Sequence, residues 1–129
     1  MKMKIHHIAI ICSDYKVSKH FYTEILGMKI LREVYREERQ SHKLDLGIDD
    51  SYVIELFSFP NPPKRPSQPE ACGLRHLAFA VEDVETKRNE LIEKGLNCEE
   101  IRVDEFTDKK FFFTQDPDHL PLEFYEAEF

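Results

Sequence analysis

The chain contains two copies of one short pattern, in which a His is followed by an apolar run that ends in Asp. The copies occupy residues 7–14 and 76–83, so they lie 69 residues apart. Similarity at a fixed offset indicates a duplicated structural unit. After each copy the chain continues to a matching glycine, Gly27 or Gly95, where the offset becomes 68. We therefore expect two half-units of equal architecture.

The first half reads as a strand, a helix and three strands. Ser13 or Asp14 supplies a helix cap, because a side-chain oxygen there accepts from the first helical amides. Val17, Phe21 and Ile25 then recur at helical spacing, and Gly27 ends the helix. The expected strands cover residues 5–12, 29–35, 41–48 and 52–59.

The second half repeats this order. Its expected helix begins at the cap Asp83, runs to about residue 94 and is closed by Gly95. The expected strands cover residues 75–81, 97–103, 110–114 and 121–126, with a turn at 115–119. Five of the seven prolines fall within residues 60–69, so this segment joins the halves. We predict an α+β protein with one domain over 1–129, comprising module one at about 4–60, a linker at about 60–72 and module two at about 73–127.

Composition excludes several classes of protein. The net charge of −7 and the lack of clustered Lys and Arg argue against nucleic-acid binding. No apolar run is long enough to cross a membrane, and the first residues lack a signal peptide. The three cysteines, Cys12, Cys72 and Cys98, form no close pair, so we expect a reducing, cytoplasmic setting.

Two His and two Glu stand at matching places in the halves. His7 matches His76, and Glu55 matches Glu123. A single His at the head of a strand is more often structural, but the repeat favours a shared role. His6 is the rival of His7, and the repeat alignment selects His7. A Glu within an apolar strand either faces solvent at an edge or requires a cation partner, because a buried unpaired carboxylate is costly.

This donor set suits a divalent metal ion. Imidazole binds nickel, cobalt, zinc and iron well, whereas carboxylates favour harder ions such as manganese. We expect six-coordinate geometry, with two positions left for water or substrate. Open positions distinguish catalytic sites from closed structural zinc sites.

The sequence resembles the vicinal-oxygen-chelate superfamily, and within it glyoxalase I, or lactoylglutathione lyase. The segments that carry the resemblance are His7, 21–22, 26–27, 53–56, 73–76, 116–118 and 122–123. The resemblance implies two βαβββ modules that form a half-open sheet around one metal ion, with ligands at His7, Glu55, His76 and Glu123. It also implies a homodimer whose sites are shared between chains, and nickel or cobalt as the favoured metal.

The implied reaction converts an α-ketoaldehyde hemithioacetal, such as that of methylglyoxal, into an α-hydroxy thioester through an enediolate. Glu123 is the expected base and Glu55 the expected group for proton return. The chain departs from the glutathione-using pattern, with Ile11 at a basic position and Phe59 at an amide position. A third departure, His119, replaces the usual glycine of the last turn. These changes leave the thiol, glutathione or another, undecided.

Three alternatives remain open. A CoA-thioester epimerase uses similar chemistry but tends to carry an amide in place of Glu55, and fosfomycin-type thiol transferases need three ligands only. A metal-free binding module would lack the ligand set altogether. The sequence fixes neither the substrate nor the native metal, nor whether modules pair within or between chains, nor the role of Cys72. The basic residues available for contacts to an anionic substrate are Arg36, Arg39, Arg65, Arg75, Lys109 and Lys110.

Overall fold

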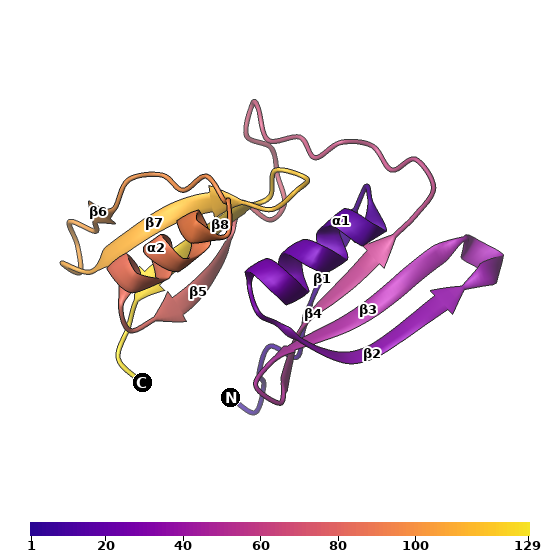
Figure 1. Cartoon of the computed structure of the whole chain (residues 1–129), viewed down its shortest axis with the longest axis horizontal. Coiled ribbons are helices and arrows are strands. Elements are labelled where there is room, and N and C mark those ends of the chain that lie inside the picture. Colours follow the sequence, from indigo (N-terminus) through magenta and orange to yellow (C-terminus); the bar gives the residue numbers. More distant parts are fainter. The chain divides into compact units, whose positions relative to one another are not determined.

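The computed structural model describes residues 1–129, which divide into two compact units, Met1–Lys64 and Arg65–Phe129. Each unit contains its own four-stranded mixed sheet with a helix against it (Figure 1). The α+β class and the order of strand, helix and three strands in each half are confirmed. That residues 1–129 act as a single domain stays a prediction. None of the helices combines the length and apolarity needed to cross a membrane.

In the first unit the strands are ordered β1-β4-β3-β2. Its elements are β1 (Ile8–Cys12), α1 (Tyr15–His20), the π-helix η1 (Phe21–Ile25), β2 (Lys29–Arg36), the 3₁₀ helix η2 (Glu37–Arg39), β3 (Ser41–Ile48) and β4 (Ser51–Ser58). β1 runs parallel to β4, whereas β3 is antiparallel to both of its neighbours. Leu44, Leu46, Ile54 and Leu56 are fully buried on one face of this sheet. Residues between them in sequence therefore point to the opposite face.

The second unit has the same arrangement, with strands ordered β5-β8-β7-β6. Its elements are β5 (Leu77–Val81), α2 (Val84–Glu93), β6 (Arg102–Val103), β7 (Lys110–Gln115) and β8 (Pro121–Glu126). β5 is parallel to β8, and β7 is antiparallel to β8 and to β6. Leu91 of α2 is buried together with Phe112, Leu122 and Phe124 of the sheet.

The predicted helix caps are confirmed in both units. Asp14 Oδ1 accepts from Val17 N at 3.2 Å, and Asp83 Oδ1 accepts from Thr86 N at 3.0 Å. Each cap satisfies one amide that the first helical turn leaves without a backbone partner. The same short signal therefore starts both helices.

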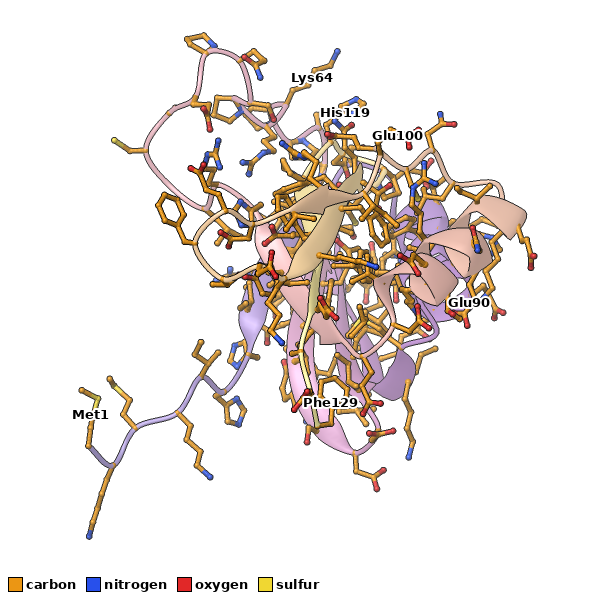
Figure 2. All side chains as sticks on the ribbon, turned by 90° about the vertical axis from the view of Figure 1, so that its left-hand side faces the viewer. Met1, Lys64, Glu90, Glu100, His119 and Phe129 are labelled. Atoms are coloured by element: carbon orange, nitrogen blue, oxygen red, sulfur yellow. The ribbon has the colours of Figure 1, made fainter.

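Three strand predictions were too long. β1 begins at Ile8, because the residues before it are exposed and extend away to Met1 (Figure 2), and β5 begins at Leu77. The strand expected over 97–103 is reduced to Arg102–Val103. Arg88 of α2 explains this loss, because its guanidinium donates to the carbonyls of Cys98 and Glu99 at 3.4 and 2.8 Å. Those carbonyls therefore bind a side chain instead of a neighbouring strand.

The change in repeat offset has a structural cause in the helix of the first unit. Leu26 N donates to Phe21 O at 3.0 Å, which is the spacing of a π-helix. At the helix end, Met28 N bonds Tyr22 O across six residues, whereas the equivalent bond in the second unit, from Leu96 N to Leu91 O, spans five. The first helix thus holds one additional residue, and the π-helical turn accommodates it.

The turn before β8 adopts the strained backbone that the sequence suggested. His119 has a φ of 69°, a left-handed conformation that usually favours glycine. Asp116 Oδ1 supports the turn by accepting from Asp118 N at 2.8 Å and from Leu120 N at 2.9 Å. These bonds fix the start of β8 and therefore the position of Glu123 along it.

Candidate metal centre

In the first unit, His7 and Glu55 lie side by side. His7 directly precedes β1, and β1 pairs in parallel with β4 so that Ala9 stands opposite Glu55. His7 Nε2 lies 3.5 Å from Glu55 Oε1. The side chain of Glu55 is mostly buried, with 16% of its surface exposed.

The second unit repeats this pair at the same register. Ala78 stands opposite Glu123 between β5 and β8, and His76 Nε2 lies 3.5 Å from Glu123 Oε1. Glu123 is 14% exposed. The four residues singled out from sequence are thus brought together as two equivalent pairs, one in each unit.

The separation within each pair suits a metal ion that binds both donors. Metal–nitrogen and metal–oxygen bonds of about 2.0–2.2 Å set donors about 3.0–3.5 Å apart for bond angles between 90° and 109°. Neither unit gathers three or more His, Cys, Asp or Glu side chains at such spacing. Each unit accordingly offers two donors, which is half of a four-ligand set.

A polar network surrounds the first pair. Lys43 Nζ lies 3.2 Å from Glu55 Oε2 and 2.7 Å from Asp45 Oδ1, and Asp45 stands opposite Glu55 on β3. Tyr52 O–H donates to Asp45 Oδ1 at 2.8 Å and lies 3.3 Å from Glu55 Oε2. The Tyr52 ring stacks on His7 with centroids 5.0 Å apart. Glu55 is therefore held by its second oxygen while its first oxygen faces His7.

The network shifts the pKa values of its members. Burial and the hydrogen bond to Asp45 raise the pKa of Tyr52. The hydrogen bond to Asp45 also raises the pKa of Lys43. Burial alone would raise the pKa of Asp45, but the hydrogen bonds from Lys43 and Tyr52 outweigh it and lower that pKa below its ordinary value. All three groups thus keep their usual charge near neutral pH.

Aromatic side chains surround the second pair instead. Phe113 stands opposite Glu123, at the position that Asp45 holds in the first unit. The edge of the His76 ring meets Phe113 with centroids 5.1 Å apart. No Lys or Arg lies within ion-pair distance of Glu123. Phe113 also lines a groove of about 560 Å³, formed with residues 95–99, 114–117 and His119.

None of the other histidines forms an ion pair with Glu55 or Glu123. His6 Nδ1 is 2.8 Å from His7 Nδ1, so the rival ligand contacts His7 and not Glu55. His42 is stacked on Tyr15, and His119 Nδ1 bonds Gln115 Oε1 at 3.0 Å. Cys72 is exposed and belongs to neither pair.

Three residues around Glu55, namely Lys43, Asp45 and Tyr52, were not predicted from the sequence. Asp45 carried a usable signal, because it is a carboxylate between Leu44 and Leu46 in an expected strand, so the reasoning applied to Glu55 also applies to it. In the structure it is only 7% exposed. Lys43 follows as the cation that such a carboxylate requires. Tyr52 carried no signal, since a Tyr in a strand is ordinary.

Two copies of a strand–helix–three-strand unit, each with a His–Glu pair at the same register, define a class of duplicated proteins with a candidate metal centre. The chain belongs to the Glyoxalase/Bleomycin resistance protein/Dioxygenase superfamily, whose family profile matches residues 4–124. The resemblance seen in the sequence is therefore confirmed at the level of the superfamily. Proteins of this superfamily typically bind a divalent metal ion, and many are enzymes.

Several relatives match over nearly their whole length. The uncharacterized protein YwkD of Bacillus subtilis is 61% identical over 122 residues, and the uncharacterized protein YaeR of Escherichia coli is 59% identical over 123 residues. Each alignment covers 95% of this chain and 95% of the relative. A glyoxalase family protein from Enterococcus faecalis has a crystal structure that is 49% identical, with a TM-score of 0.90, covering 97% of this chain and 98% of that one.

More distant structures share the fold alone. A glyoxalase I variant from Zea mays is 23% identical with a TM-score of 0.83, covering 98% of this chain and 46% of that one. The fosfomycin resistance protein FosX from Listeria monocytogenes, complexed with Mn(II), is 14% identical with a TM-score of 0.76, covering 99% and 95%. The fold thus occurs with more than one chemistry, so the reaction has to be argued from the site.

Proposed function

We propose that this protein is a metal-dependent, glyoxalase-like lyase or isomerase that acts on α-ketoaldehyde hemithioacetals. The observation that carries the proposal is the pair of equal His–Glu separations, 3.5 Å in each unit, at equivalent register. Glu123 is mostly buried with no Lys or Arg beside it, and a carboxylate in such a place requires a cation. Glu55 turns an oxygen toward its own His at the same separation, which supports one shared metal ion. The product would be an α-hydroxy thioester, and the chemistry would pass through an enediolate.

His7, Glu55, His76 and Glu123 would hold one divalent ion, nickel or cobalt by preference, with zinc, manganese or iron as alternatives. When bound, the ion acts as a Lewis acid that stabilises negative charge on two adjacent substrate oxygens. A homodimer in which each site draws residues from both chains is part of the proposal. So are the single domain over 1–129, built from two modules, and the cytoplasmic setting.

Glu123 is the base in this proposal. A general base needs an oxygen that is free to approach the proton it removes. Lys43 and Tyr52 hold the second oxygen of Glu55, whereas Glu123 has only His76 beside it. Glu123 would therefore remove the proton from the carbon of the hemithioacetal, and Glu55 would support its return to the neighbouring carbon.

Thioester formation from methylglyoxal and glutathione tests the proposal. Metal-stripped protein is reloaded separately with nickel and with zinc, and absorbance of the thioester is followed. We expect turnover, with kcat lowered about 10²–10⁴-fold in Glu123→Gln, the range for loss of a general base. Glu128→Gln, at an exposed position, serves as the matched control and should retain full activity.

The outcomes separate the parts of the proposal. Turnover that survives in Glu123→Gln would remove Glu123 from the role of base. A protein that takes up no metal ion would defeat the proposed centre itself. Tight, stoichiometric metal uptake without turnover would mean that the substrate is wrong, and Ile11 and Phe59 would direct the search to other thiols and CoA thioesters.

A further inference from the structure

The face of the first sheet that carries Glu55 is organised in rows across the strands. One row contains Arg32, Asp45 and Glu55, which stand opposite one another on β2, β3 and β4. Arg36 lies four residues further along β2, where it pairs with Ser41. Successive rows are two residues apart along a strand, so these four residues span two rows, or about 13 Å. Arg36 is thus on the same face as Glu55 but towards the far end of the sheet.

Aromatic rings hold the guanidinium of Arg36 in place. Its carbon Cζ lies 4.8 Å from the ring centroid of Phe57 and 5.6 Å from that of Phe59. Nη2 donates to Ser41 Oγ at 2.8 Å. A planar guanidinium that stacks on rings and bonds one hydroxyl has lost much of its freedom before any ligand arrives.

Arg36 also lacks the partner that such a cation usually has. No carboxylate lies within ion-pair distance of it, and its Nε is shielded from solvent without a hydrogen-bond partner. Arg102 in the second unit provides the contrast. It lies over Phe111 and Phe113 at 5.0 and 5.5 Å, but Glu99 is 3.6 Å from its guanidinium. Of these two arginines, Arg36 is therefore the one whose charge is not neutralised by a carboxylate of the chain.

We propose that Arg36 binds an anionic group of the substrate or its thiol, a carboxylate or a phosphoryl group. Guanidinium recognises both through paired hydrogen bonds. The guanidinium leans back over Phe57, one row from Glu55, so the anion would lie roughly 7–13 Å from the metal-binding end of the molecule. Phe57 and Ile11 stand opposite each other between these two ends, which favours an apolar middle segment.

This inference rests on the proposed function only for the position of the metal-binding end. It also gives Phe59 a role. Phe59 replaces an amide of the glutathione-using pattern, and here its ring supports Arg36. Recognition of the anion would then depend on Arg36, supported by Phe59, and not on a basic residue at position 11 or an amide at position 59.

The test uses molecules with a hydroxamate, which chelates metal ions, at one end and a variable group at the other. The probes are suberic acid monohydroxamate, the matched compound with a terminal amide, and the matched compound with a terminal phosphonate. Calorimetry on the metal-loaded protein gives their affinities without any turnover. We expect the acid or the phosphonate to bind about tenfold or more tightly than the amide, and the tighter of the two identifies the anion.

Two variants test whether Arg36 causes the preference for the anionic probes over the amide. Arg36→Met keeps an unbranched apolar stem over the rings and should bind acid, phosphonate and amide equally. Arg39→Met removes a positive charge from an exposed position three residues away and should keep the wild-type preference. Equal binding of all three probes to the wild type, or a preference that persists in Arg36→Met, would overturn the inference.

A second measurement does not depend on the metal. Metal-free protein labelled with nitrogen-15 is titrated with suberate, and the arginine Nε–H signal that is missing from Arg36→Met is followed. A saturable shift of this signal is expected. If the hydroxamates fail to bind because the metal centre is wrong, this shift still supports the anion site, whereas its absence refutes it.

Discussion

The two His–Glu pairs have the same geometry but opposite surroundings. Glu55 touches Lys43 and Tyr52 and stands opposite Asp45, whereas Glu123 stands opposite Phe113 and meets no cation. The pairs themselves retain the same separation of 3.5 Å. Duplication thus conserved the donor atoms while the neighbouring strand, β3 or β7, changed its chemistry.

The difference in surroundings indicates different roles for the two carboxylates, Glu55 and Glu123. A carboxylate that accepts from Lys and Tyr is fixed in position by those bonds. A carboxylate beside aromatic rings makes no such bonds and keeps an oxygen available for the proton of a substrate. The comparison therefore predicts that the polar network is needed for the first half of the site and has no counterpart in the second.

The largest expected effect comes from Lys43→Met. It removes the ammonium that contacts both Asp45 and Glu55, two largely buried carboxylates, and breaking such an ion pair is costly. We expect the free energy of unfolding of the metal-free protein to fall by about 2–4 kcal/mol in urea titrations. Lys29→Met is the control, because its pair with Asp50 is exposed and such pairs contribute about 0–1 kcal/mol. Equal losses in the two variants would contradict a structural role for the network.

Tyr52→Phe should have a smaller effect. It removes the hydroxyl that donates to Asp45 and keeps the ring that stacks on His7. Because this hydrogen bond goes to a charged group, its loss should lower the free energy of unfolding by about 1–2 kcal/mol in urea titrations. Tyr15→Phe removes a hydroxyl bonded to Glu33, a carboxylate that belongs to neither His–Glu pair, and should change metal affinity less than Tyr52→Phe does. A reversed order would mean that Tyr52 does not position the first pair.

The smallest expected effect is a dependence on pH in Asp45→Asn, since Asn still accepts hydrogen bonds from Lys43 and Tyr52. The folded protein lowers the pKa of Asp45, so its ionised form adds stability above the unfolded pKa of about 4. That stability is lost as the pH falls through the lower folded-state pKa. Unfolding of wild type and Asp45→Asn at a series of pH values should show a gap at pH 7 that closes below about pH 4. A gap that is constant with pH would assign the effect to packing.

Much of this arrangement was predictable because it depends on local patterns. The repeat located both helix caps, both closing glycines and the four candidate ligands, since each involves a short motif at a fixed offset. Strand bounds failed where a side chain from another element intervened, as Arg88 does at Cys98 and Glu99. The network around Glu55 was missed because it depends on which residues face one another across β3 and β4, and this register is set by tertiary structure.

The π-helical turn of the first unit also bears on how such chains tolerate changes in length. A residue added within a strand exchanges its two faces, and Glu55 would then point into the core. A residue added to the helix is absorbed by the wider turn at Phe21–Ile25, and the strands that follow keep their phase. A change of one residue within this helix therefore leaves the register of the following strands unchanged. The number of residues in this helix can therefore vary while His7 and Glu55 stay together.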